Sequence, residues 1–201
     1  MPTNSLAYKA GSLVFGLRGI SGTIIDPQPI IIKLQELNFI GLPLHEVSTS
    51  QFLVGNKFLQ WITFMGCSPY VELEPNTAGK PFCHVRIAGP WPYPRLCYGS
   101  NTKGPCCLKC RKRFLQWRAT LDIWEKPAAD TVISCAHCGH AQNPVDLNWR
   151  REAGLGQLFI MVENIFPGEA GPVSGLLPEL KDITGGYWEY FYVVDAPRLL
   201  I

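Results

Sequence analysis

The chain has 201 residues, of which 47% are hydrophobic and 17% charged, and it includes 6 Trp, 7 Tyr and 10 Phe. This is enough apolar material for a core, which excludes an intrinsically disordered chain and one held together only by disulfides. The formal net charge of +2 is nearly balanced, whereas a dedicated nucleic-acid-binding domain is usually far more basic.

The N-terminal residues, Met1 to Gly11, lack a basic stretch followed by a long apolar core, so they do not resemble a signal peptide. No apolar run is long enough to cross a bilayer, since Ile30–Ile32 is interrupted by Lys33. We therefore expect a cytoplasmic protein with no membrane partner. In a reducing compartment, the eight Cys are expected to be thiols or metal ligands rather than disulfides.

The first half of the chain predicts one helix. The first 45 or so residues contain only short apolar stretches and no clear element. Ser48 and Gln51 then resemble a capping box, and apolar residues at helical spacing follow. Residues 50–65 are therefore expected to form a helix that ends at Gly66.

Strands are expected on both sides of a Gly- and Pro-rich loop. Tyr70–Glu74 and Phe82–Ala88 are typical of strands, the second because apolar residues alternate with His84 and Arg86. Later in the chain, Leu158–Val162 is a continuous apolar run of the length of a central strand. Tyr187–Val194 is rich in aromatic and β-branched residues and predicts a further strand.

A short helix is expected at Pro178–Thr184, because Pro is allowed in the first turn and Gly185 can end it. These elements predict an α+β fold, with an antiparallel or mixed sheet and helices on one face. Residues 1–103 and 144–201 would form this main domain, and residues 104–143 would form an inserted module.

Two C-x-x-C pairs carry the clearest chemistry, Cys107 with Cys110 and Cys135 with Cys138. A two-residue gap lets a tight turn direct both sulfurs to one point, and two such knuckles supply the four thiolates that Zn²⁺ accepts in a tetrahedral site. Gly139 supplies the freedom for positive φ that a knuckle favours. The spacing predicts one zinc ion bound by these four cysteines.

This segment resembles the zinc-ribbon superfamily over residues 104–142, and the rest of the chain resembles no specific family. The resemblance implies a hairpin between the knuckles, so we expect a strand within Phe114–Trp124, although the apolar residues there also share a helical face. Four thiolates close the coordination sphere and leave no position for a catalytic water, so the zinc is expected to be structural.

The sequence alone leaves some of the metal-ligand choices open. Cys106 precedes Cys107 and would give a C-x-x-x-C pair if it replaced it. His137 lies inside the second knuckle and His140 follows it, so either imidazole would be able to replace a sulfur.

A basic cluster surrounds the predicted ribbon and is interleaved with Phe114 and Trp117. Cations follow phosphates and aromatic rings stack on bases, so this cluster is the basis of a nucleic-acid hypothesis. The alternative, which the low net charge favours, is a solvated face that balances the charge of the metal centre. The cluster consists of Lys103, Lys109, Arg111, Lys112, Arg113 and Arg118.

The remaining cysteines, Cys67, Cys83 and Cys97, are expected to be small buried apolar side chains. Cys83 and His84 are neighbours on a predicted strand, so their side chains should point to opposite faces and not form a catalytic pair. Arg150 and Arg151 are interpreted as a charged surface step, with anion binding as the alternative.

Carboxylates follow the predicted central strand at Glu163 and Glu169, a position where binding crevices often lie. The leading functional hypothesis is nonetheless a non-enzymatic zinc protein that contacts another protein or a second copy of itself. The alternatives are a nucleic-acid-associated protein that uses the basic ribbon, and an enzyme whose site lies near Glu163–Glu169.

Overall fold

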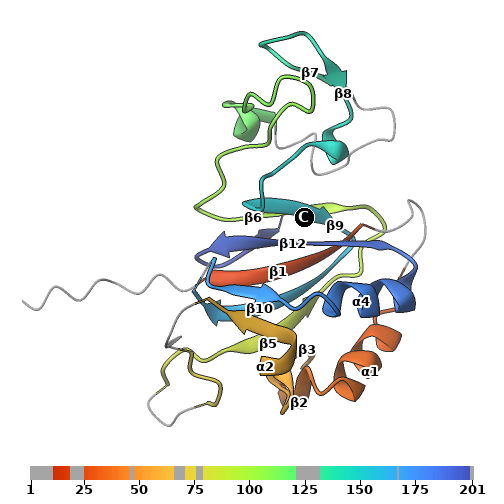
Figure 1. The fold of residues 1–201 in the computed structure, drawn as a ribbon, viewed down its shortest axis with the longest axis vertical. Coiled ribbons are helices and arrows are strands. Elements are labelled where there is room, and N and C mark those ends of the chain that lie inside the picture. Colours follow the sequence, from red (N-terminus) through yellow and green to blue (C-terminus); the bar gives the residue numbers. More distant parts are fainter. Residues whose placement is uncertain are drawn as a thin grey trace, which may run out of the picture.

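A six-stranded antiparallel sheet forms the centre of the protein in the computed structural model, which describes residues 11–18, 25–45, 48–65, 71–75, 79–120, 132–166 and 168–199. The strand order is β12-β1-β10-β5-β3-β2 (Figure 1). The first described strand, β1, therefore lies between β12 and β10, which both come late in the chain. Its members are β12 (Tyr187–Val194), β1 (Gly11–Arg18), β10 (Leu158–Ile165), β5 (His84–Ala88), β3 (Ser48–Val54) and β2 (Ile40–His45).

One face of this sheet packs against helices. Helices α1 (Gln28–Glu36) and α4 (Leu176–Thr184), with the one-turn helix α2 (Phe58–Trp61), lie on the same side in Figure 1. They bury apolar side chains in one cluster with the inward residues of β1, β5 and β10. The α+β class, the antiparallel sheet and the placement of helices on one face agree with the prediction.

The opposite face packs against a small sheet of β13 (Arg198–Leu199), β6 (Arg95–Tyr98) and β9 (Ala153–Gly156). Phe159 and Phe191 from the large sheet and Cys97 from β6 share the core between the two sheets. A Cβ on Gly154 would lie 2.4 Å from the ring of Phe191, so only glycine allows β9 to approach this closely.

Two short strand pairs complete the fold. β4 (Ile62–Phe64) pairs with β11 (Ala170–Pro172), and β7 (Ile133–Ser134) pairs with β8 (Ala141–Gln142). The second pair belongs to the cysteine-bearing segment, which lies beyond the small sheet on the side away from the helices (Figure 1).

Several predicted elements are confirmed. Leu158–Val162 lies within β10, an interior strand of the large sheet, and Tyr187–Val194 is β12. Phe82–Ala88 contains β5, and α4 ends at Gly185, whose φ of 65° and N–H bond to the Lys181 oxygen form the expected glycine cap.

The helix predicted over residues 50–65 is wrong. Residues 48–54 form strand β3, which pairs with β5 and β2, and the capping-box positions Ser48 and Gln51 lie within this strand. Phe52, Phe58 and Ile62 are core residues, but they come from a strand, a one-turn helix and another strand. Pairing with two neighbouring strands outweighs the helical spacing of these apolar residues.

The strand predicted at Tyr70–Glu74 is also wrong over its described part, residues 71–74, which form no strand. Val71 and Leu73 still pack against the main core, so the alternation of side chains is real. One hydrogen bond, from the N–H of Cys83 to the Glu72 oxygen, joins this segment to the residue that precedes β5. Of the helices in the described ranges, none has the length and apolar character needed to cross a membrane.

Candidate metal centre

The structure brings together the four sulfurs that the two C-x-x-C pairs predict. The ligand atoms of Cys107, Cys110, Cys135 and Cys138 all lie within 4.8 Å of one another. The Sγ atoms of Cys107 and Cys138 are 3.8 Å apart, and those of Cys110 and Cys135 are 3.6 Å apart. These separations are far too long for disulfide bonds, whose sulfurs lie ~2.05 Å apart. The four cysteines are positioned to hold a metal ion.

The two knuckles have the same backbone geometry. In the first, the N–H of Arg111 bonds to the Cys107 oxygen at 2.9 Å; in the second, the N–H of Gly139 bonds to the Cys135 oxygen at 2.8 Å. The fourth residue after the leading cysteine has positive φ in both, 60° at Arg111 and 66° at Gly139. The role predicted for Gly139 is confirmed, and an arginine occupies the matching position of the first knuckle.

Gln142 holds the first knuckle, and the sequence contained no signal for it. This buried residue comes from β8, and its Oε1 accepts the N–H of Leu108 at 2.9 Å. Its Nε2 is buried and has no hydrogen-bond acceptor of ordinary geometry in the part of the chain described. The side-chain amide of Gln142 also acts to lower the pKa of Cys107, which favours the thiolate form of this cysteine. A metal-bound thiolate is the acceptor that such a buried N–H would be able to use, so the site fits a thiolate-bound metal.

The electrostatics of the knuckle favour a thiolate at Cys107. Burial of the sulfur opposes ionisation, but the backbone N–H groups of Cys110 and Lys109 outweigh it and lower the pKa of Cys107 to about 6. The pKa of Cys110 is raised to about 11: the N–H of Lys112 favours its thiolate, but burial and hydrogen bonding to the other sulfurs outweigh that effect. Binding of a metal to all four sulfurs would therefore release protons.

The alternative ligands lie outside this group of sulfurs. Cys106 is buried, and its N–H bonds to the Asn148 oxygen at 2.8 Å. His137 lies within the second knuckle and is exposed, and the backbone oxygen of His140 accepts the N–H of Cys135. None of these three side chains is in the group of ligand atoms that lie within 4.8 Å of one another.

The segment between the knuckles is not a strand where the structure describes it. Trp117–Thr120 is a short 3₁₀ helix, and residues 121–124 of the predicted strand lie outside the described residues. Trp117 is buried between Tyr98 and Trp149, with ring centroids 5.5 Å and 5.4 Å away and nearly perpendicular planes. Edge-on packing of a buried tryptophan against two other rings is energetically favourable. The described part of this segment is therefore held by the packing of Trp117 and not by the expected hairpin.

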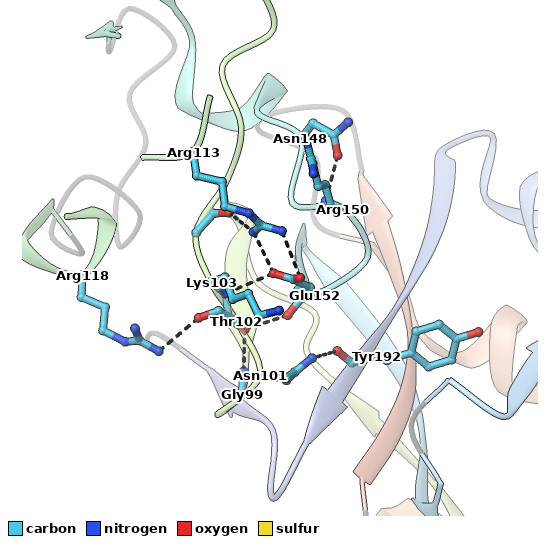
Figure 2. A network of polar contacts seen from close by, with 11 residues as sticks. Gly99, Asn101, Thr102, Lys103, Arg113, Arg118, Asn148, Arg150, Glu152 and Tyr192 are labelled. Atoms are coloured by element: carbon cyan, nitrogen blue, oxygen red, sulfur yellow. Dashed lines mark hydrogen bonds and ion pairs between the residues drawn. The ribbon is translucent and has the colours of Figure 1, made fainter. Parts of the chain in front are cut away.

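Glu152, another residue without a sequence signal, joins this segment to the chain before β9 (Figure 2). Its carboxylate accepts two bonds from the Arg113 guanidinium, at 2.9 and 3.1 Å, and one from the N–H of Lys103 at 3.1 Å. Its backbone oxygen accepts the hydroxyl of Thr102 at 2.7 Å. The carboxylate of Glu152 raises the pKa of Arg113, so this guanidinium stays charged.

The predicted basic cluster is divided by these contacts. Arg113 is bound to Glu152, and Arg118 donates to the Thr102 oxygen while its guanidinium lies 4.5 Å from the centre of the Trp117 ring. The other four members are exposed. They are Lys103, Lys109, Arg111 and Lys112.

The leftover cysteines are buried where the structure describes them. Burial raises the pKa of Cys83 to about 12, and it also raises the pKa of Cys97, so both thiols stay protonated. Cys83 lies in the core beneath the helices, whereas His84 lies on the other face of the sheet and bonds to Glu163. The two side chains diverge, as predicted. Cys67 lies outside the described residues.

Glu163 is held in an ion-pair group rather than left open for chemistry. Its Oε2 lies 3.0 Å from His84 Nε2, and its Oε1 lies 2.6 Å from Arg86 Nη2. Burial opposes ionisation, but these two partners outweigh it and lower the pKa of Glu163. Glu169 contributes its backbone oxygen to the N–H of Met65. Both oxygens of the Glu163 carboxylate are therefore already engaged, one by Arg86 and one by His84.

Comparisons of the chain with protein-family models, with curated proteins and with solved structures find no match. The class of protein is therefore defined by the site itself. Four cysteines positioned to hold a metal ion, in an α+β protein built on an antiparallel sheet, make this chain a candidate metal-binding protein.

Proposed function

We propose that Cys107, Cys110, Cys135 and Cys138 bind one Zn²⁺ ion, and that this zinc stabilises the segment that carries them. The spacing of the sulfurs is the observation that supports it. With zinc–sulfur bonds of ~2.3 Å, a tetrahedral site places its sulfurs about 3.8 Å apart. The two Sγ distances of 3.8 and 3.6 Å lie close to that value.

The role proposed for the zinc is structural. Four thiolates complete a tetrahedral coordination sphere, so no position remains for a water or substrate. The regular structure around the site is small, with β7 and β8 of two residues each. Short strand pairs are marginal by themselves in water, so the free energy of metal binding would support this part of the fold.

Elemental analysis of untagged protein tests the proposal, with Cys135→Ser and Cys106→Ser as a matched pair. Both residues are buried, but only Cys135 belongs to the group of four sulfurs. We expect one zinc per chain in the native protein and in Cys106→Ser, and loss of zinc in Cys135→Ser. Absence of zinc from the native protein, or its loss from Cys106→Ser, would refute this ligand set.

We further propose that the zinc-bearing segment contacts a second copy of the chain. It presents apolar side chains to solvent, among them Leu115, which is 80% exposed. The same segment lines a groove of about 400 Å³, and Leu115 is one of the lining residues together with Phe114, Ala136 and His137. Exposed apolar surface next to a groove is typical of a protein interface.

Light scattering at increasing protein concentration tests this contact. We expect the native protein to self-associate and Leu115→Asp to remain monomeric. Leu59, which is 57% exposed on α2, offers a control, because Leu59→Asp changes an exposed leucine outside the zinc-bearing segment. A native protein that stays monomeric at all concentrations, or equal effects of the two substitutions, contradicts the proposal.

A further inference from the structure

A cleft of about 750 Å³ lies at the β12 edge of the large sheet, where segment 146–153 approaches it. Its lining includes Tyr187 and Tyr190 of β12, Leu177 of α4 and Leu108 of the first knuckle. The volume lies within the range of small-molecule sites, ~300–1,000 Å³. We call it the β12 cleft, and none of the four clustered cysteines lines it.

Two arginines reach the β12 cleft from an unusual turn. The N–H of Glu152 bonds to the Trp149 oxygen at 3.0 Å, and the central residues, Arg150 and Arg151, have φ of 51° and 60°. Positive φ at both central positions is the requirement of a type I′ turn, which strongly favours Asn and Gly. Residues with a Cβ are strained in that conformation, and such strain is concentrated at ligand-binding sites.

The contacts of these arginines differ. The guanidinium of Arg151 lies 4.3 Å from the centre of the Tyr190 ring, and its backbone oxygen accepts the N–H of Tyr192. Arg150 uses its backbone N–H to bond Asn148 Oδ1 at 2.8 Å (Figure 2). The Arg150 side chain is exposed, and among the described residues no carboxylate lies within ion-pair distance of it.

The charges that line the β12 cleft leave an excess of one positive charge. Arg18 and Glu189 neutralise each other through an ion pair of 3.0 Å. Asp146 then remains as the acidic residue of the lining, against Arg150 and Arg151. An anion with one or two charges would complement this set, and guanidinium groups suit phosphate oxygens because they donate in pairs.

The same cleft offers uncovered apolar and aromatic surface. Tyr187 is 62% exposed and Leu108 is 50% exposed. A simple inorganic anion would make no use of either side chain. A flat ring would gain by stacking on Tyr187 and by covering Leu108, because base–aromatic stacking contributes measurably to affinity whatever the base.

We propose that the β12 cleft binds a nucleotide, with its phosphate at Arg150 and Arg151 and its base against Tyr187. The nucleotide is either a free one or one unit of a single-stranded nucleic acid, since both present the same phosphate and base. This site is distinct from the basic cluster near the knuckles and does not depend on the identity of the metal.

Binding measurements at low salt with four probes test the proposal. They are AMP, a short single-stranded oligonucleotide of mixed sequence, an abasic phosphodiester chain of the same length, and a glutamate peptide of the same charge. We expect the oligonucleotide to bind and the abasic chain to bind about tenfold more weakly, because it lacks the bases. Binding of AMP as well indicates a free nucleotide, and binding of the oligonucleotide alone indicates single-stranded nucleic acid.

Three variants locate the site. Arg150→Asn removes the cation but keeps a residue that suits the turn, and Tyr187→Ser removes the ring. Each is expected to weaken binding about tenfold. Arg198→Asn is the matched control, since Arg198 is exposed on β13 and does not line the β12 cleft, and it should bind as the native protein does.

Several results would overturn the proposal. They are the absence of saturable binding by both AMP and the oligonucleotide, equal binding of the abasic chain, and equal binding of the glutamate peptide, which would indicate an acidic-peptide site. Native affinity in Arg150→Asn and Tyr187→Ser, or an equal loss in Arg198→Asn, would also exclude this cleft. If affinity is lost instead in a variant with Arg111 and Lys112 changed to Ala, the ligand binds at the first knuckle.

Discussion

The ion pair between Glu152 and Arg113 should contribute more to stability than an ordinary surface pair. The two side chains are only 20% and 24% exposed, and they share two hydrogen bonds in the paired geometry of guanidinium and carboxylate. The same carboxylate accepts the N–H of Lys103. We therefore choose Glu152→Gln, which keeps an acceptor for that N–H but removes the charge.

The expected magnitude follows from the burial. Hydrogen bonds to charged groups contribute ~1.5–3 kcal/mol, whereas exposed ion pairs contribute ~0.2–1 kcal/mol. Because solvent still reaches about a fifth of each side chain, we place the coupling free energy between Glu152 and Arg113 near 2 kcal/mol. The pair of Lys33 and Glu179, with side chains 32% and 40% exposed, should couple by less than about 1 kcal/mol.

Two double-mutant cycles, one for each ion pair, measure these couplings. Urea unfolding of the native protein, Glu152→Gln, Arg113→Met and the double variant gives the first coupling, and Lys33→Met with Glu179→Gln gives the second. We expect the first to exceed the second clearly. If the coupling between Glu152 and Arg113 falls within about 0.5 kcal/mol of zero, the error of such cycles, the network around Glu152 does not join the two segments as described.

Three further predictions concern single residues. The hydrogen bond that His84 donates to the Glu163 carboxylate, the largest effect, raises the pKa of His84 above its usual 6.5, so the imidazolium stabilises the fold below pH 6.5 and this contribution is lost as pH rises through the raised value. As pH rises above 6.5, the unfolding temperature of the native protein should therefore fall more steeply than that of His84→Gln, and parallel curves would contradict this. The matching positions in the two knuckles should respond with opposite sign: Gly139→Ala should destabilise by about 1–2 kcal/mol and Arg111→Gly should stabilise slightly, because both residues have positive φ. By the same reasoning, Arg150→Asn should raise the free energy of unfolding by up to about 1 kcal/mol in urea, and a loss of stability would show that the Arg150 side chain supports the fold.

The pairing of cysteines within each knuckle could be predicted from the sequence because its geometry is local. A C-x-x-C pair defines a knuckle within a few residues, so the convergence of Cys107 with Cys110 follows from the turn itself. The supporting residues could not be predicted in this way. Gln142 and Glu152 reach partners 34 and 39 residues away in sequence, and no local pattern distinguishes them from ordinary polar residues.

The prediction of the fold succeeded where burial alone decides the element. β10 and β12 are long apolar or aromatic runs that few structures other than strands accommodate. It failed for β3, where Phe52, Phe58 and Ile62 mimic helical spacing, because the deciding contacts are with β5 and β2. It also left β1 unassigned, since its eight residues show no clear period before their neighbours are known.

The position of β1 has a consequence for how the protein matures. Residues 11–18 are synthesised long before both of their strand partners, residues 158–165 and 187–194. This apolar strand must therefore stay unpaired until those partners have been made, and such exposed strands favour aggregation and slow folding. The four cysteines are complete by residue 138, before either partner strand exists. Metal capture should thus precede closure of the sheet, and pulse-labelling of stalled nascent chains would reveal that order.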